Sequence, residues 1–576
     1  MARSVNPAGE TPGFGIPPAL ASQMTVREQR EWLDTFLRAR PVSRRSALRG
    51  AAGTLAGLGL AAAEAACAGG STPGGAAAAP SRMVGRHLAF GADPLTQMAV
   101  AAELAARPDG KVLLDLGTGT DYGHTVEAEV RHLVSMVPQQ DGSIRGAEQF
   151  FVHGLADHLS PGSRYHYRLR LPDGSTTTDA TFSTAPAPGA RDRFTFTAFA
   201  DQGVNAGRAG VTTAFSDDYY KPEDTRRAPE PAQALVGLIA ARNPAFHLLA
   251  GDICYADPSG MGRPVRNNAP GEPDKGFDNF DPTLWSAYFA SIESSASMTP
   301  WMFATGNHDM EALYDDNRSP GGAAHGYGGH LARLDLPKTG PSNCPSVYTF
   351  RYGNVGVLSL DANDLSTEIR TNAGYSGGAQ TAWVRRTLAG LRGDPGIDFI
   401  VAFFHHCAFA TSGSHASDAG VREALAPLFD EFSVDLVVQG HNHQYERTNP
   451  IRAGRSAAQA PDGATVRPET DGTTYVCVGS GGRPRYSWQP NVTDRFRGFA
   501  GPDSGTEVAS FVNTADGSKA PETVDWSQAR YLDYAFLQVD VVPGPAGAES
   551  TLTVRAITDG GREIDSVTLV RGTKTV

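Results

Sequence analysis

The sequence predicts a chain of mixed α and β structure, in which an all-β domain of roughly seven strands precedes a larger α/β domain. The first observation behind this prediction is a series of short apolar alternations, separated by turn residues, over 83–187. The second is a change of pattern from 192 onward, where near-continuous apolar strands alternate with helical stretches. With 576 residues, 40% of them hydrophobic, the chain is long enough to build a large core in each domain.

The N-terminal segment, residues 1–66, is typical of a twin-arginine export signal. Arg44 and Arg45 precede a soft apolar stretch, 51–63, that ends at small residues. This stretch is shorter and less apolar than the ~20 residues of a membrane-spanning helix, so no transmembrane segment is expected. A basic turn ahead of a core helix is the alternative. We therefore expect a secreted or cell-envelope protein that uses the twin-arginine translocation machinery, and continued export after both arginines are changed to lysine would contradict this.

The same region leaves two alternatives open. The chain could start at Met1 or at Met24, and Cys67 could carry a lipid anchor, although the residues before it fit a lipoprotein signal poorly and we favour secretion. Residues 67–82 form a Gly-, Pro- and Ala-rich stretch that is typical of a flexible linker. The folded part of the chain is therefore expected to begin near Met83.

The first folded domain is expected at 83–187. Tyr165 and Tyr167 follow the turn at Pro161-Gly162, an arrangement typical of the tyrosine corner of fibronectin type III-like β-sandwiches. No cluster of catalytic residue types is found in this range. We therefore interpret this domain as a fibronectin-like scaffold.

The second domain is expected at 192–576, and it combines strands with helices. Helical stretches are predicted at 231–242, 284–296, 380–391 and 419–432. The apolar runs at 535–542 and 550–570 are predicted to be closing strands of the same domain.

Residues of metal-binding types follow the ends of five apolar strands in this second domain. They are Asp201, Asp252, Asn307, His405, His441 and His443. In open α/β sheets the ligand site lies outside the carboxyl ends of the strands. Carboxylate, amide and imidazole groups suit hard and borderline cations, and a carboxylate shared by two ions would make a two-metal site suited to phosphoryl displacement. Each motif alone could be a turn, a loop or a buried core histidine, but their conjunction favours a metal site.

Charge and cysteine content narrow the possible partners. The 62 Asp and Glu exceed the 50 Lys and Arg, and no basic run is present, which disfavours nucleic acid and anionic membrane surfaces. The five cysteines are too few for a disulfide scaffold, and none of them forms a CxxC pair, which excludes structural zinc held by thiolates. A small molecule or another protein is the favoured partner.

Five sequence blocks around the strand ends resemble, in order, the blocks of calcineurin-like metallophosphoesterases. The blocks are Asp201-Gln202-Gly203, Gly251-Asp252-Ile253-Cys254-Tyr255, Gly306-Asn307-His308-Asp309, 401–405 and Gly440-His441-Asn442-His443. More narrowly they are similar to those of purple acid phosphatases, because Gly203 stands where most of the superfamily has histidine and Tyr255 stands three residues after Asp252. The resemblance covers 82–576 and implies a fibronectin-like sandwich followed by an αββα metallophosphoesterase sandwich.

The resemblance also implies a role for each residue of the site. Fe(III) would be held by Asp201, Asp252, Tyr255 and His443. A divalent ion, Fe, Zn or Mn, would be held by Asp252, Asn307, His405 and His441, so that Asp252 bridges a dinuclear centre. His308 and His415 match histidines that contact the substrate phosphate and the leaving group, although His415 could instead be a solvated loop residue.

The resemblance implies an acid phosphatase, which cleaves small phosphomonoesters by attack of a metal-activated hydroxide on phosphorus, and the predicted export signal makes it an exported one. A phosphodiesterase or nucleotide-cleaving enzyme would use the same metal site and is the alternative. A noncatalytic surface-binding protein is the remote alternative, and it predicts the loss of a metal ligand, whereas none is lost here.

Other residues near these blocks are expected to have structural roles. His406 directly follows a predicted ligand and is expected to support it. Cys254 and Cys407 are expected to be buried near the metals, with a disulfide as the alternative. The insert at 257–281 is expected to overhang the site and to select substrates through Arg263 or Arg266, or else to be a variable surface loop.

Overall fold

The computed structural model describes residues 83–138, 144–204, 231–257, 260, 280–311, 325–486 and 508–573. The predicted export signal and linker, with Arg44, Arg45 and Cys67, lie outside these ranges, and so do Arg263 and Arg266 of the insert. Within these ranges, no helix is both long enough and apolar enough to cross a membrane.

The N-terminal region forms one antiparallel sheet, which confirms the predicted β-rich domain. Its strands are β1 (Met83–Phe90), β2 (Met98–Leu104), β3 (Val112–Gly117), β4 (His124–Pro138), β5 (Ile144–Ala156), β6 (Arg164–Arg170) and β7 (Ala180–Ser183), paired in the order β1-β2-β5-β4-β3-β6-β7. Leu114 of β3 packs on Gly154 of β5 although β4 separates these strands in the pairing order, so the sheet folds back on itself. The backbone N–H of Ser160 donates to Tyr165 Oη at 2.9 Å, the contact expected of a tyrosine corner. The fibronectin-like classification itself stays a prediction.

The second domain is built on two further sheets. The first contains, in pairing order, β10 (Trp301–Phe303), β9 (His247–Leu249), β8 (Phe194–Phe199), β24 (Ala535–Val542), β25 (Glu549–Thr558), β26 (Glu563–Gly572) and β19 (Ala464–Val466). The second contains β11 (Tyr348–Tyr352), β12 (Val355–Ser359), β13 (Phe399–Phe403), β15 (Leu436–Gln439), β20 (Thr474–Val478), β16 (Tyr445–Thr448) and β23 (Ser527–Tyr531). Two small sheets join β14 (Ser417–Asp418) to β21 (Val508–Asn513) and β22 (Lys519–Val524), and β17 (Ile451–Arg452) to β18 (Arg455–Ser456).

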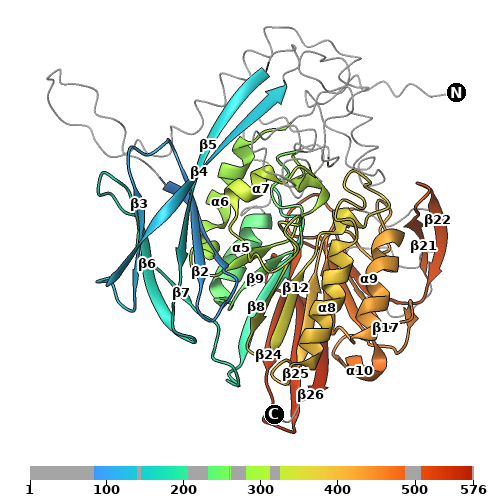
Figure 1. The fold of residues 1–576 in the computed structure, drawn as a ribbon. Helices are drawn as coiled ribbons and strands as arrows, with labels where there is room; N and C mark the ends of the chain where they lie inside the picture. Colours follow the sequence, from blue (N-terminus) through green and yellow to red (C-terminus); the bar gives the residue numbers. More distant parts are fainter. Residues whose placement is uncertain are drawn as a thin grey trace, which may run out of the picture.

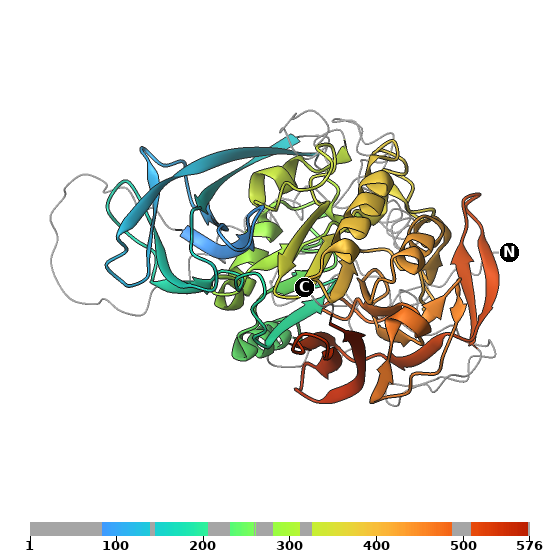
Figure 2. The ribbon, with the colours of Figure 1, turned by 60° about the horizontal axis from the view of Figure 1, so that its bottom comes forward.

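The helices of this domain lie outside the two large sheets (Figures 1 and 2). They are α5 (Pro231–Arg242), α6 (Thr283–Ala296), α7 (Gly328–Arg333), α8 (Ala379–Gly393), α9 (Ala419–Glu431) and α10 (Pro468–Asp471), with the 3-10 turns η3 (Asn307–Asp309) and η5 (Ala362–Asp364). Helix α5 covers the first sheet, because Arg242 lies over the ring of Phe536 on β24 and donates to Gln538 at 2.6 Å. The four helices predicted from the sequence are thus confirmed, close to their predicted ends.

Strand β13 shows how the layers pack. Alternate side chains of a strand point to opposite faces of its sheet. Phe399, Val401 and Phe403 join the core between the two large sheets, whereas Ile400 and Ala402 join the core under α8 and α9. Burial on both faces explains why the strand reads as a continuous apolar run. The second domain therefore has the predicted layers of helix, sheet, sheet and helix (Figure 1).

The N-terminal sheet packs on the outer helices of the second domain. Strand β1 lies along α6, and Tyr167 Oη donates to Ser297 O, at the end of that helix, at 2.6 Å. His153 Nε2–H donates to Ala332 O of α7 at 2.8 Å. Buried polar contacts of this kind fix the position of one domain on the other.

Acid is expected to weaken this domain contact through His153. Burial and the nearby Arg131 cation lower the pKa of His153 from 6.5 to about 3, so the folded ring stays neutral where an unfolded chain would protonate it. The contribution of neutral His153 to the free energy of unfolding is complete above pH 6.5 and is lost as the pH falls toward 3. One such group accounts for at most about 1.4 kcal/mol per pH unit.

The measurement is urea unfolding between about pH 7 and pH 4. His153→Gln should lose less stability on acidification than the wild type, because its amide can still donate to Ala332 O but takes up no proton. His124→Gln, at an exposed position, should behave as the wild type does. An identical acid response in His153→Gln and the wild type would contradict the prediction.

Candidate metal centre

The candidate site lies where the carboxyl ends of parallel strands from the two large sheets meet. In the first sheet, the parallel strands β8, β9 and β10 end just before Asp201, Asp252 and Asn307. In the second sheet, the parallel strands β13 and β15 end just before His405 and His441. Strand β8 contacts β15, so both sets of strand ends reach the same edge of the domain.

Three of the predicted ligands form a first cluster. Tyr255 Oη donates to Asp201 Oδ1 at 2.9 Å and lies 3.0 Å from His443 Nε2. His443 Nε2 is in turn 3.3 Å from Asp201 Oδ1. Because the Nδ1–H of His443 donates to Pro484 O at 2.7 Å, its Nε2 is the nitrogen that faces the cluster.

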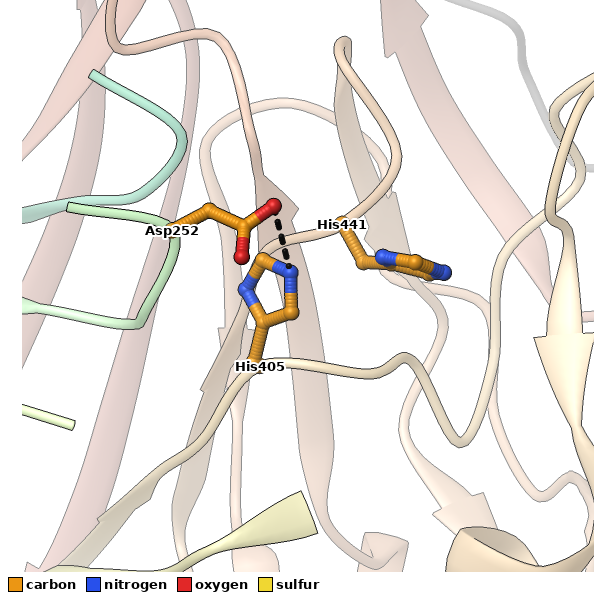
Figure 3. Close-up of side chains that lie close together, drawn as sticks. All are labelled: Asp252, His405 and His441. Carbon is orange, nitrogen blue, oxygen red and sulfur yellow. Dashed lines mark ion pairs between the residues drawn. The ribbon is translucent and has the colours of Figure 1, made fainter. Parts of the chain in front are cut away.

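Three further predicted ligands form a second cluster beside the first. His405 Nε2 is 3.1 Å from both Asp252 Oδ2 and Asn307 Oδ1, and Figure 3 shows its ion pair with Asp252. The same nitrogen is 3.9 Å from Asp201 Oδ1 of the first cluster. The Nδ1–H of His405 donates to Ala250 O at 2.9 Å, which turns Nε2 toward the site.

His441 joins the second cluster from the loop after β15 (Figure 3). Asp252, His405 and His441 each offer a ligand atom within 4.8 Å of the others. The backbone N–H of His441 donates to Asp201 Oδ2 at 2.8 Å and ties its loop to the first cluster. The structure therefore brings all the sequence-predicted ligands into one buried site: Asp201, Asp252, Tyr255, Asn307, His405, His441 and His443.

The backbone of the site has positive φ at several ligand positions. The angle is 58° at Asp201, 51° at Asp252, 58° at Tyr255 and 65° at His441. Residues other than glycine rarely adopt positive φ, and each residue held in this conformation costs on the order of 1–3 kcal/mol of stability. Gly306 lets the third block approach the second, because a Cβ there would overlap with the carboxylate of Asp252. Strain concentrated in this way is typical of functional sites.

Burial and mutual charge shift the pKa values of the clustered groups. Burial, with repulsion from Asp252, raises the pKa of Asp201 to about 7. Burial alone would lower the pKa of His405, but Asp252 and Asp201 more than offset it and raise this pKa to about 10. Burial and the same carboxylates hold the pKa of Tyr255 well above its ordinary value. A multivalent cation would favour the ionised form of these acids and would displace the proton of His405.

The donor set fits hard and borderline metal ions. The ligand atoms of the first cluster lie 2.9–3.3 Å apart, and His405 Nε2 of the second lies 3.1 Å from Asp252 and from Asn307, separations that ligands ~2.1 Å from a shared ion would also have. Among the residues that the structure describes, no thiol joins them. The cysteines of the described ranges, Cys254, Cys344, Cys407 and Cys477, are buried and free, so none of them forms the disulfide that was the alternative.

His308 lies at the edge of the site, in η3. Its ring centroid is 4.2 Å from that of Tyr255, and its Nε2 is 3.9 Å from Asp252 Oδ2. Its Nδ1–H donates to Asp257 O at 2.7 Å, which turns Nε2 toward the metal ligands. Gly260, within the insert, lies against the same ring, as expected of an insert that overhangs the site.

His415 is fully buried, so the alternative of a solvated loop histidine is wrong. Its ring centroid is 4.0 Å from that of His441, and its Nε2 is 3.3 Å from Tyr486 Oη. Tyr486 stacks on His443 with 4.0 Å between centroids. His406 is also buried and packs on His441 at 4.3 Å, in a supporting position.

Two residues of the site have no signal in the sequence. Glu368, in the loop after η5, accepts from His415 Nδ1 at 2.8 Å and from His441 Nε2 at 3.1 Å. Burial alone would raise the pKa of Glu368, but these two histidines more than offset it and leave the pKa well below its ordinary value. The guanidinium of Arg483 lies 4.3 Å from the ring centroid of Tyr255.

Arg483 also gives a physical reason for the glycine of the first block. A Cβ at Gly203 would collide with the side chain of Arg483 and would approach the ring of Tyr255 to 3.3 Å. Any side chain at this position would therefore require Arg483, and to a smaller extent Tyr255, to shift. Glycine at position 203 thus leaves the space that the side chains of Arg483 and Tyr255 occupy.

Comparisons with known proteins agree with this geometry. The model of the family described as calcineurin-like phosphoesterase matches residues 228–445. An uncharacterized protein of Mycobacterium tuberculosis is 30% identical over 516 residues, which span 84% of this chain and 87% of that protein.

More distant relatives come from plants. Purple acid phosphatase 23 and probable inactive purple acid phosphatase 1 of Arabidopsis thaliana are each 25% identical, over 60% and 58% of this chain and 66% and 49% of theirs. The solved structure of purple acid phosphatase PPD1 from yellow lupin (Lupinus luteus) seeds superposes with a TM-score of 0.58 and 19% identity, over 86% of this chain and 75% of that one. This last likeness is one of fold.

Proposed function

This chain belongs to the calcineurin-like phosphoesterase superfamily as a purple acid phosphatase-like, metal-dependent phosphoester hydrolase, and on that premise we propose that it is an exported acid phosphatase. Its substrates would be small phosphomonoesters, and its cofactor would be a dinuclear centre of Fe(III) and a divalent ion. The observation that carries the proposal is the contact of Tyr255 with Asp201 and His443, since a phenolate is a preferred ligand of a hard ferric ion.

The two clusters would divide the ions between them. The first cluster, with Asp201, Tyr255 and His443, would hold the ferric ion. The second, with Asn307, His405 and His441, would hold the divalent Fe, Zn or Mn, and Asp252 would contact both. When bound, two such ions supply a nucleophile from water and stabilise charge on the oxygens of an in-line phosphoryl displacement.

The side chains around the ligands would position the substrate. The backbone N–H of His308 donates to Asp252 Oδ1 at 2.9 Å, which fixes the carboxylate that would contact both ions. With its Nδ1–H bonded to Asp257 O, His308 would present Nε2 to a phosphate ester bound at the metal site. His415, which packs on His441 of the second cluster, would contact the same substrate from that side of the site. Export rests on Arg44 and Arg45 in the sequence and is part of the proposal.

The expected colour of the protein tests the ferric assignment. A ferric phenolate absorbs visible light, so oxidised wild-type protein should be pink to purple and Tyr255→Phe should be colourless. Tyr348→Phe is the control, because Tyr348 is equally buried and donates to Phe303 O at 2.9 Å within the sheet core. A colourless, iron-free and fully active wild type would contradict the assignment.

A phosphodiesterase or nucleotide-cleaving enzyme would use the same ligands. Initial rates on 4-nitrophenyl phosphate and on bis(4-nitrophenyl) phosphate separate these activities. A higher kcat/KM for the monoester supports the phosphatase assignment, whereas a higher value for the diester contradicts it. Hydrolysis of neither ester by the metal-loaded protein would favour the noncatalytic alternative.

A further inference from the structure

We infer that Glu368 is a positioning residue that fixes two histidines of the site at once, the proposed metal ligand His441 and the substrate-side His415. The inference rests on the proposed function, because it takes His441 as a ligand of the divalent ion. Glu368 belongs to none of the five sequence blocks and comes from the chain between the third and the fourth.

The two carboxylate oxygens of Glu368 have different partners. Oε1 lies 2.8 Å from His415 Nδ1, and Oε2 lies 3.1 Å from His441 Nε2. Asn513 Nδ2 donates to Oε2 as well, at 3.2 Å. Because three N–H groups converge on it, the carboxylate accepts all three hydrogen bonds and both histidine nitrogens are donors.

These hydrogen bonds select the tautomer of each ring. With the Nε2–H of His441 bonded to Glu368, Nδ1 is the nitrogen that serves the second cluster. A ligating histidine commonly donates its other N–H to a carboxylate in this way, which fixes the ring and raises its basicity. With the Nδ1–H of His415 bonded to the same carboxylate, its Nε2 faces Tyr486. One side chain thus couples the orientation of a metal ligand to that of a substrate-side group.

The loop that carries Glu368 is held by Asp418, the N-cap residue of α9. The carboxylate of Asp418 accepts from Ser366 Oγ at 2.7 Å, from Thr367 N at 2.9 Å and from Glu368 N at 3.1 Å. The side chain of Glu368 is 9% exposed. The carboxylate therefore reaches the histidines from a rigid, buried support, as positioning requires.

The same three side chains have another geometric interpretation, as ligands of a third cation. Their ligand atoms lie within 4.8 Å of one another. The N···O separations of 2.8 and 3.1 Å suit hydrogen bonds and ligands of one ion alike, so the protons of His441 decide between the two interpretations. A third ion on His441 Nε2 would require this ring, already a proposed ligand through Nδ1, to lose both of its protons. The geometry therefore favours positioning over a third metal.

Glu368→Gln tests the inference, because it keeps the size of the side chain but sets an amide NH₂ against one of the two ring N–H groups. Full-length protein that retains iron and has lost its divalent ion is titrated with Zn²⁺. The variant should bind Zn²⁺ about 10- to 100-fold more weakly than the wild type, the usual effect of removing the carboxylate partner of a ligating histidine. Its iron content and visible absorption should not change, because the first cluster does not contact Glu368.

Glu522→Gln is the matched control. Glu522 pairs with Arg422 at 2.8 Å on β22, next to the strand of Asn513, and contacts neither histidine. It should bind Zn²⁺ as the wild type does. If Glu368→Gln does not fold, Glu368→Asp is measured instead, and its carboxylate, too short to span both rings, should still weaken Zn²⁺ binding.

Two results overturn the inference. Unchanged Zn²⁺ affinity in the Glu368 variant shows that the carboxylate does not position His441. A second equivalent of Zn²⁺, beyond the one that refills the divalent site, that is bound by the wild type and lost in the variant assigns Glu368 to a metal site of its own. A wild-type protein that holds fewer than two ions refutes the proposed function instead, and the titration distinguishes that result from the other two.

Discussion

Replacement of Asp252 by asparagine is expected to remove both metal ions and to lower the activity by at least about 10⁴-fold. Its carboxylate accepts from the backbone N–H of His308 at 2.9 Å and lies 3.1 Å from His405 Nε2, which is itself 3.9 Å from Asp201 Oδ1 of the first cluster. Metal ions stabilise the transition state by several kcal/mol, and each 1.4 kcal/mol is about tenfold in rate. Elemental analysis and initial rates on 4-nitrophenyl phosphate measure the two effects.

Asp398→Asn is the control for the loss of a buried carboxylate. Asp398 is as buried as Asp252 and accepts from Asn354 Nδ2 at 2.8 Å and from Ser550 Oγ at 2.7 Å. It precedes β13, at the end of the strand opposite to the metal site. This variant should retain both ions. An Asp252→Asn protein that keeps two ions and full activity would show that this carboxylate does not join the clusters.

Replacement of His308 by alanine is expected to preserve both ions and the colour but to lower turnover by about 10²- to 10⁴-fold, the range for loss of general acid–base assistance. His308 Nε2 lies 3.9 Å from Asp252 Oδ2, close enough to reach an oxygen of a phosphate ester bound at the proposed metal site. Burial lowers the pKa of this ring to about 3, and an anionic phosphate beside it would raise that pKa again.

The dependence on the leaving group identifies what His308 does. Aryl leaving groups need little protonation, so His308→Ala should lose less turnover on aryl phosphates than on alkyl phosphates. His330→Ala is the control, because it opens a similar cavity at another buried histidine outside the site. Metal loss from His308→Ala, or an equal defect on both kinds of ester, would rule out action at the leaving group.

Much of the fold could be predicted because its signals are local. The run at 399–403 is apolar throughout because β13 is buried on both faces. The ligands could be found for the same reason, since Asp252 and His405 each follow such a strand within a few residues. Carboxyl ends of parallel strands share an edge, so residues far apart in sequence could be expected together.

Other features depend on contacts between residues far apart in the sequence, which no local sequence pattern predicts. Glu368 reaches His441 across 73 residues, and only the packing of its loop on α9 brings the two together. Arg483 lies over Tyr255 from a loop far along the chain. The division of the strands into two sheets is also nonlocal, because β8 pairs with β24 near the end of the described chain.

The metal content of an active preparation tests the central claim most directly. Under the proposed function the two clusters hold two ions per chain, and the place of Tyr255 beside Asp201 predicts that at least one of them is iron. Elemental analysis of purified protein, taken together with its phosphatase activity, should therefore give two metal ions per chain, including iron. An active preparation that contains a single ion or none, or two ions without iron, would contradict the account.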